Sequence, residues 1–167
     1  ADALERLIPG VKQQLKLTRF PFPLNTDSWD GYPAARDRVL AAMRAAQGNA
    51  IVLTGDTHTA WANELNDANG RVGVEFGTTS ITSPGDGEYF APFGIDFGAG
   101  VRARNPHVKY TDSLHRGFLL LTLTREQALA EFFSVSNILS KEYETTRVAA
   151  YTVAPEPGPG IGAVTEA

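Results

Sequence analysis

The residues with the clearest chemical potential lie in the stretch 54–58, Thr-Gly-Asp-Thr-His, directly after the short apolar run 50–53. The apolar run predicts a buried strand, and ligands of open α/β sheets collect beyond the carboxyl ends of such strands. Asp56 offers a carboxylate oxygen and His58 an imidazole nitrogen, a mixed pair that suits iron, zinc or manganese. The stretch could equally be a structural turn with His58 packed on Trp61, and the pattern leaves both interpretations open.

A second candidate site is a basic stretch in a chain whose net charge is −4. It carries two of the chain's three histidines, and its members are Arg102, Arg104, Asn105, His107, Lys109, His115 and Arg116, with Asp112 as the one acid among them. A local basic patch in an acidic protein is what a phosphoryl or carboxylate site needs. The alternative is a solvent-exposed loop with scattered arginines.

The elements that must position these residues follow from periodicity and turn residues. A helix is expected to start near Pro33 and another to occupy residues 2–8, and Trp61–Leu65 is expected to form one or two helical turns. Residues 77–106 are rich in glycine and proline and are expected to be mostly loop. Strands are predicted at 50–53, 72–76, 118–123, 128–135 and 145–153, the fourth with Leu129 and Phe132 or Phe133 facing inward.

Composition bounds the fold and the class of protein. The chain has 167 residues, of which 43% are apolar, and this is typical of one soluble domain. Its acidic balance argues against a nucleic-acid-binding surface, and no apolar run is long enough for a membrane span. The absence of cysteine excludes disulfides and thiolate chemistry. The order of elements predicts an α/β layer architecture over 1–153, followed by an extended or disordered tail at 154–167.

Five ordered blocks of the sequence resemble a known family, the PhoD-like (alkaline phosphatase D) metallophosphoesterases. The blocks are 29–38, 52–62, 74–85, 105–110 and 115–118. The resemblance implies the C-terminal part of a calcineurin-like core, with two packed mixed β-sheets flanked by helices. It also implies hydrolysis of phosphate monoesters or diesters at a multi-metal centre, by attack of a metal-activated water on phosphorus.

The resemblance also implies roles for individual residues. Asp56 and His58 are expected at the metal site, with iron and calcium as the ions and zinc or manganese as alternatives. His58 and His107 are expected to be catalytic, and Asn105 with Arg102 and Arg116 to contact the substrate, a phosphate ester. Family members of this type are exported, which predicts a periplasmic, cell-wall or extracellular location.

The sequence departs from the superfamily in one respect, because the earlier metal-binding blocks Asp-x-His, Gly-Asp-x-x-Asp and Gly-Asn-His are missing. One ligand pair is too few for a binuclear centre, so the chain is expected to need an N-terminal portion, either preceding it or present as a second chain. Alone it is expected to be catalytically incompetent and poorly folded, since partner strands would be absent. Two other interpretations stay open: a non-catalytic module with a basic anion-binding loop, and a different metal-dependent hydrolase.

Overall fold

The computed structural model describes residues 27–157 and 160–167, and the helix expected at 2–8 lies outside them. The chain divides into two units, residues 1–38 and 39–167, each described here by itself. Within the described residues, no helix is long and apolar enough to cross a membrane.

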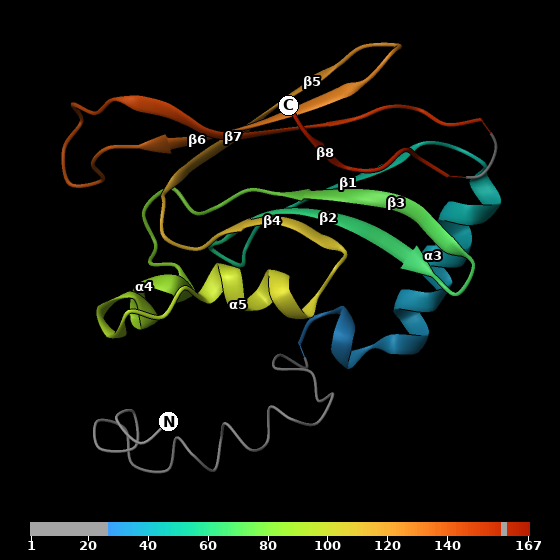
Figure 1. The fold of residues 1–167 in the computed structure, drawn as a ribbon, viewed down its shortest axis with the longest axis horizontal. Coiled ribbons are helices and arrows are strands. Elements are labelled where there is room, and N and C mark those ends of the chain that lie inside the picture. The colour runs from blue at the N-terminus through green and yellow to red at the C-terminus, as the bar shows by residue number, and fades with distance from the viewer. Residues whose placement is uncertain (1–26, 158–159) are drawn as a thin grey trace. The chain divides into compact units, whose positions relative to one another are not determined.

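Figure 1 shows the order of the elements along the chain. They are η1 (Trp29–Gly31), α3 (Pro33–Ala46), β1 (Ala50–Thr54), β2 (Ala60–Asp67), β3 (Gly70–Gly77), α4 (Asp86–Phe90), η2 (Ala91–Phe93), α5 (Phe97–Arg104), β4 (Val108–Asp112), β5 (Gly117–Leu123), β6 (Ala128–Val135), β7 (Thr145–Val153) and β8 (Thr165–Glu166). The α/β class predicted from the sequence is confirmed.

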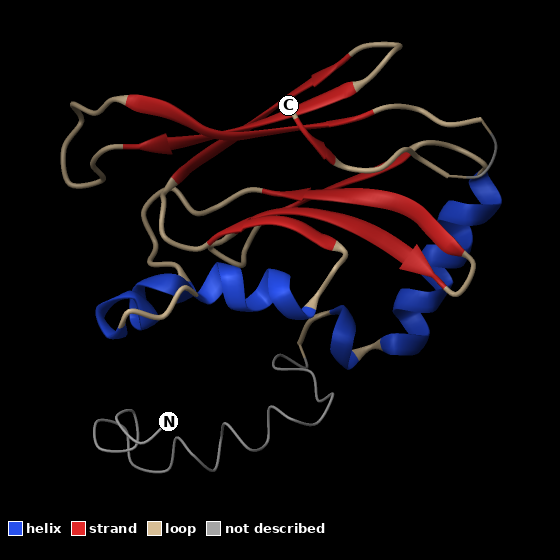
Figure 2. Ribbon diagram, viewed as in Figure 1, coloured by secondary structure: helices blue, strands red, loops and turns tan. Residues whose placement is uncertain are grey.

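The strands form two four-stranded sheets that lie face to face (Figure 2). The first sheet has the order β1-β3-β2-β4 and is mixed, because β1 runs parallel to β3 while the other pairs are antiparallel. The second has the order β5-β6-β7-β8 and is antiparallel throughout. The expectation that both sheets are mixed is therefore wrong for the second, because its strands are neighbours in chain order and each runs opposite to the one before.

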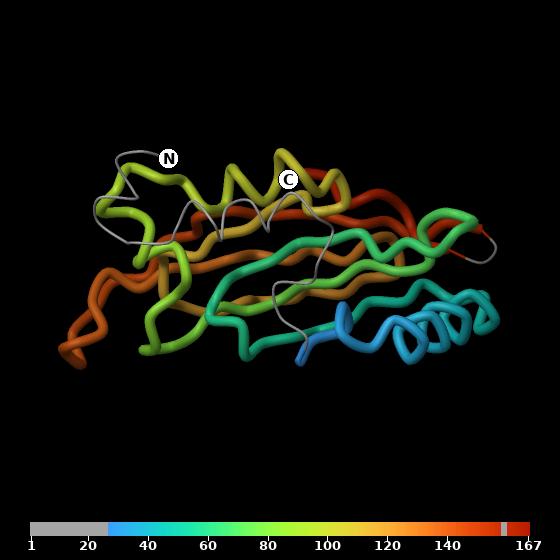
Figure 3. The backbone as a smooth tube through the Cα atoms, turned by 90° about the horizontal axis from the view of Figure 1, so that it is seen from below, coloured from blue at the N-terminus to red at the C-terminus, as the bar shows by residue number. Residues whose placement is uncertain are grey.

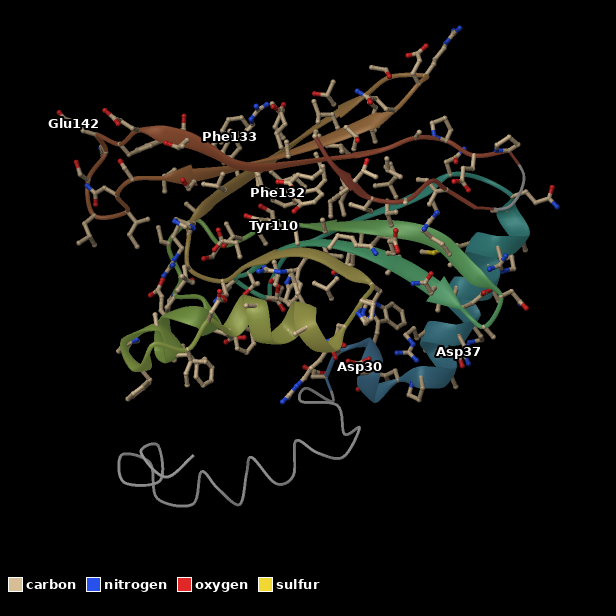
Figure 4. The ribbon with its side chains drawn as sticks, viewed as in Figure 1. Asp30, Asp37, Tyr110, Phe132, Phe133 and Glu142 are labelled. Carbon is tan, nitrogen blue, oxygen red and sulfur yellow. The ribbon has the colours of Figure 1, made fainter. Side chains whose placement is uncertain are left out.

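The core of the 39–167 unit lies between the two sheets. Its members from the first sheet include Ala60, Ala62, Val74 and Phe76, and those from the second include Ala130, Phe132, Tyr151 and Val153. Figure 4 shows Tyr110 and Phe132 pointing toward one another in this space, and their ring centroids are 4.9 Å apart. Phe133 lies on the opposite face of β6, stacked on Phe118. The inward face of β6 is thus the face of Phe132, and the expectation for Leu129, which lies on the other face, is wrong.

Two predictions about local structure also fail. The segment Trp61–Leu65 belongs to strand β2 rather than to a helix, and β2 pairs with β3 across the two-residue turn Ala68-Asn69. The segment 77–106 is not mostly loop, because it contains α4, η2 and α5. In β2 the buried side chains are alanines and one glutamate, so the alternation typical of a strand is weak in the sequence.

Helices α4 and α5 lie on the face of the first sheet that is turned away from the second (Figures 1 and 2). Figure 3, seen from below, shows that the segment carrying these helices runs alongside β4. The carbonyl oxygen of Thr111 in β4 lies 3.1 Å from the place that a Cβ on Gly98 of α5 would take. A larger residue here would have to push the strand away by a few tenths of an ångström, so glycine suits this close approach of helix to strand. The Asp96 carboxylate accepts a hydrogen bond from the Ala99 N–H and caps the start of α5.

The helix predicted to start near Pro33 is α3, which ends at Ala46. Gln47 takes the left-handed conformation that commonly ends a helix, with φ of 50°, and Gly48 follows it. The Arg44 guanidinium forms a two-pronged ion pair with Asp67, with N–O distances of 2.5 and 2.6 Å. Hydrogen bonding from Arg44 holds the pKa of the Asp67 carboxyl below its usual range, so the pair anchors the end of α3 to the β2–β3 turn.

Within the described part of the 1–38 unit, Asp30 accepts a hydrogen bond from Arg36 at 3.1 Å. This ion pair joins the first 3-10 turn to the start of α3. The neighbouring aromatic side chains of Trp29 and Tyr32 are both exposed.

The described residues of the 154–167 segment are extended, and they add to the second sheet and to the core. Strand β8 pairs with β7, and Pro155 forms a bridge with Ile161. Ile161 and Val164 are buried among the core residues. This end of the chain therefore contributes apolar contacts as well as strand pairing.

Candidate metal-binding loop and the adjoining histidine pair

The loop that follows β1 holds Asp56 and His58 in strained backbone conformations. Their φ angles are 69° and 53°, in the left-handed region that non-glycine residues rarely occupy. The Thr57 N–H donates to the Gly55 carbonyl at 2.8 Å, and the Trp61 indole donates to the Thr57 hydroxyl at 2.9 Å. Each strained residue costs on the order of 1–3 kcal/mol and persists where the surroundings impose it, commonly at functional sites.

A hydrogen bond to the Pro84 carbonyl fixes the tautomer of the neutral His58 ring. Its Nδ1 lies 3.0 Å from the Pro84 carbonyl oxygen, which can only accept, so Nδ1 carries the proton in this hydrogen bond. In the neutral ring this leaves the Nε2 lone pair free, which is the tautomer that a metal ligand needs. The donor set of Asp56 and His58 therefore fits two positions of a metal site. No cluster of three or more His, Cys, Asp or Glu able to hold a metal ion occurs in 27–157 and 160–167.

Two further segments pack against this loop. The Thr79 hydroxyl lies 3.3 Å from the His58 carbonyl oxygen and 2.9 Å from the His115 carbonyl oxygen. A Cβ on Gly85 would overlap the Ser113 carbonyl oxygen and would lie 2.8 Å from the His58 carbonyl oxygen. The loop of His58, the segment 79–85 and the connection between β4 and β5 therefore meet at one end of the first sheet.

Asp112 and His115 form a fixed pair at this meeting point. The His115 Nδ1 lies 2.7 Å from Asp112 Oδ2, while Oδ1 accepts the backbone N–H groups of Leu114 and His115 at 2.9 and 3.1 Å. The carboxylate is shielded, with 15% of its side chain exposed, whereas the His115 ring is 56% exposed. Asp112 thus orients the ring and leaves Nε2 accessible.

Asp112→Asn is expected to destabilise the folded chain near neutral pH and to lose this effect in acid. Burial raises the pKa of the Asp112 carboxyl, but the hydrogen bonds from Leu114 and His115 outweigh burial and hold the pKa below its usual value of 3.8. A carboxyl whose pKa is lowered by folding contributes stability above its unfolded pKa, and this contribution disappears as the pH falls through the folded pKa.

Urea unfolding of the wild type and of Asp112→Asn, at about pH 7 and at about pH 3, checks this prediction. The difference between their free energies of unfolding should shrink toward the lower pH. A difference that stays constant would show that the carboxylate charge contributes nothing to stability.

Arg116 is buried, with 8% of its side chain exposed. Its guanidinium donates to the Leu114 carbonyl at 2.8 Å and forms an ion pair with Glu88 of α4. Hydrogen bonding from Arg116 holds the pKa of the Glu88 carboxyl below its usual range. Arg116 therefore ties α4 to the connection between β4 and β5.

Two other predicted site residues, His107 and Asn105, lie at the opposite end of β4. His107 is exposed and precedes β4, and its carbonyl accepts the Glu64 N–H at 2.8 Å. The Asn105 side chain donates to the Val101 carbonyl at 2.9 Å, at the end of α5. Because Ala60 pairs with Asp112 and Asn63 with Val108, the length of β4 separates these residues from the loop of His58. The structure brings together His58, His115 and Arg116 and leaves out His107 and Asn105.

Thr79 and Asp112 are positioning residues that sequence reasoning missed. The spacing Asp112-x-x-His115 is a usable signal, because it allows an Asp carboxylate to accept local backbone N–H groups and the ring of the histidine together. Thr79 offers no such signal, since its two partners lie 21 and 36 residues away in the chain.

Comparison with known proteins identifies similar sequences. The sequence profile of the PhoD-like phosphatases matches residues 5–132. Alkaline phosphatase D of Bacillus subtilis strain 168 is 38% identical to this chain over 112 residues, which are 64% of the chain and 18% of that protein.

A solved structure described as the structure of PhoD superposes with a TM-score of 0.66 at 28% sequence identity. The match covers 84% of this chain and 26% of that one. The chain therefore spans about a fifth to a quarter of the length of the proteins that it matches.

Proposed function

The chain belongs to the PhoD-like phosphatase family, and from that premise we propose that it forms the C-terminal part of a metal-dependent phosphoric-ester hydrolase with a calcineurin-like core. In this proposal it contributes Asp56 and His58 to a metal centre whose further ligands come from segments outside the chain. The observation that carries the proposal is the loop after β1, where both side chains stand on left-handed backbone and Nδ1 of His58 is engaged by the Pro84 carbonyl.

The chemistry of the donors supports this assignment. Carboxylate and imidazole together suit iron, zinc or manganese, and a carboxylate oxygen also suits calcium. Metal ions held here would supply Lewis acidity toward a water and toward the phosphoryl oxygens. The Pro84 carbonyl keeps the His58 ring in the tautomer whose Nε2 can bind, as carbonyl partners of histidine ligands do in metal sites.

Basic residues near this loop have different roles in the proposal. Arg116 is a positioning residue, because its guanidinium is buried and already paired with Glu88. Arg102 is exposed, donates to the Thr111 carbonyl at 3.2 Å and is available to a substrate oxyanion. Export from the cytoplasm, which the resemblance implies, stays a prediction.

Paramagnetic broadening by Mn²⁺ tests the proposed ligand pair. The chain has three histidines, so the ring signals of His58, His107 and His115 can each be assigned by single substitution. We expect Mn²⁺ at low concentration to broaden the His58 signals first, because a ligand ring lies closest to the ion. Asp56→Asn is expected to abolish this broadening at the same Mn²⁺ concentration.

His107→Gln is the matched control, because it removes a histidine at the far end of β4 and should leave the broadening of His58 unchanged. Hydrolysis of bis(p-nitrophenyl) phosphate by the complete enzyme should then be lost in Asp56→Asn and retained in His107→Gln. Preferential broadening of His107, or full activity of Asp56→Asn, would overturn the proposal.

A further inference from the structure

A cavity of about 450 Å³ lies beside the Asp112–His115 pair. Its walls come from the segment 87–102, from residues 110–115 and from Val148 of β7. The volume falls within the range of small-molecule sites, which are mostly apolar with a few convergent polar groups. Phe97 and Tyr110 supply aromatic surface, and Leu114 adds aliphatic surface.

The polar groups of the cavity leave donors for a ligand. The Asp96 carboxylate caps α5, and the Asp112 carboxylate accepts two backbone N–H groups and the His115 ring. Among the described residues the Arg102 guanidinium donates once, to the Thr111 carbonyl, and it has five N–H donors in all. Both carboxylates are thus satisfied by the protein, while Arg102 has further donors to offer.

We propose that this cavity binds the substrate of the enzyme, a small phosphoric ester with a flat apolar organic group, through Arg102 and His115. The phosphoryl oxygens accept hydrogen bonds from the Arg102 guanidinium and from Nε2–H of His115, and the organic group lies against Phe97 and Tyr110. This identification of the ligand as the substrate rests on the proposed function. Thr79 supports the identification of the ligand as the substrate, because its hydroxyl connects the backbone of His115 at the cavity to that of His58 in the proposed metal site.

Because the Asp112 carboxylate accepts from Nδ1 of His115, the proposed hydrogen bond from Nε2–H to a phosphoryl oxygen is made by the protonated ring.

The test is an NMR titration of the 167-residue chain with phenyl phosphate in metal-free buffer. We expect saturable shifts of the His115 ring signals, unchanged His107 signals, and weaker binding of inorganic phosphate and of phenol. Arg102→Gln and His115→Gln should each weaken binding about tenfold. Arg104→Gln, an exposed arginine on the same helix, is the matched control and should change little.

The comparison with phenol separates a binding role of His115 from a structural one. Because the His115 ring contacts only the phosphoryl group in this proposal, His115→Gln should weaken the binding of phenyl phosphate and leave the binding of phenol unchanged. Equal weakening by Arg102→Gln and Arg104→Gln, or shifts of His115 that do not saturate, would overturn the proposal. Because no metal is present, the outcome does not depend on Asp56 and His58, so the two proposals fail separately.

Discussion

Gly117→Ala is expected to destabilise the folded chain by about 3 kcal/mol, among the largest effects of any single methyl group here. Gly117 begins β5 and pairs with Ser134 of β6. A Cβ at this position would overlap the Phe133 carbonyl oxygen and would lie 3.0 Å from the Ser134 Cα. Both obstacles are backbone atoms, so no rotamer change relieves the clash and the two strands must separate.

Separation of the strands at this point should also disturb the candidate site. Gly117 directly follows His115 and Arg116, and the Val135 N–H donates to the Arg116 carbonyl at 2.8 Å. We therefore expect Gly117→Ala to shift the His115 ring signals as well as to lower stability.

Gly100→Ala is the matched control for this substitution, with an effect of opposite sign. Gly100 lies in helix α5, and among the described residues no atom beyond the backbone of that helix comes within 4 Å of the place its Cβ would take. Alanine in a helix is more favourable than glycine by about 0.5–1 kcal/mol, so this variant should be slightly stabilised. Urea unfolding of the three proteins checks both expectations. If Gly117→Ala proved as stable as the wild type, the close pairing of β5 and β6 at this point would be incorrect.

Glu64→Ala is expected to cost about 3 kcal/mol, because it leaves two cations without their shared partner. Glu64 lies on the inward face of β2, and its side chain is 10% exposed. Its carboxylate contacts Arg71 at 3.0 Å and Lys109 at 3.2 Å, and it accepts the Val164 N–H at 3.3 Å. One carboxylate therefore connects β2, β3, β4 and the C-terminal segment.

The loss should be concentrated at the C-terminal segment. Arg71 donates to the Ile161 carbonyl at 2.7 Å and thereby holds the C-terminal segment. The position of Arg71 depends in turn on its ion pair with Glu64. Hydrogen exchange of the Val164 amide should accelerate in Glu64→Ala by more than that of amides in β6.

Two variants make this second prediction specific. Glu126→Ala, at the exposed turn between β5 and β6, is the control and should change the free energy of unfolding by less than about 0.5 kcal/mol. Combining Glu64→Gln with Lys109→Gln should cost less than the sum of the two single substitutions, since the pair interacts directly. Additive effects would show that the ion pair contributes no coupling.

Much of the strand architecture was predictable because the responsible residues are local. The run 50–53 and the alternation at 72–76 indicate strands whatever their partners, and the Asn69-Gly70 turn indicates a hairpin. The pairing of Asp56 and His58 in one loop was predictable for the same reason, as both lie within the four positions that follow β1. β2 was missed, because its buried face carries Ala60, Ala62 and Glu64 and lacks large apolar residues.

The basic stretch between Arg102 and Arg116 shows what tertiary structure alone decided. In the sequence it reads as one patch, but β4 runs through it and carries Lys109 and Asp112 toward opposite ends. Lys109 is paired with Glu64, Arg116 with Glu88, and His115 with Asp112. Local sequence thus determined the loop that carries Asp56 and His58, most strands and the presence of positive charge. Which of those charges remain free for a ligand depends on partners up to 45 residues away in the chain, and only the packing of the sheets and helices brings such partners together.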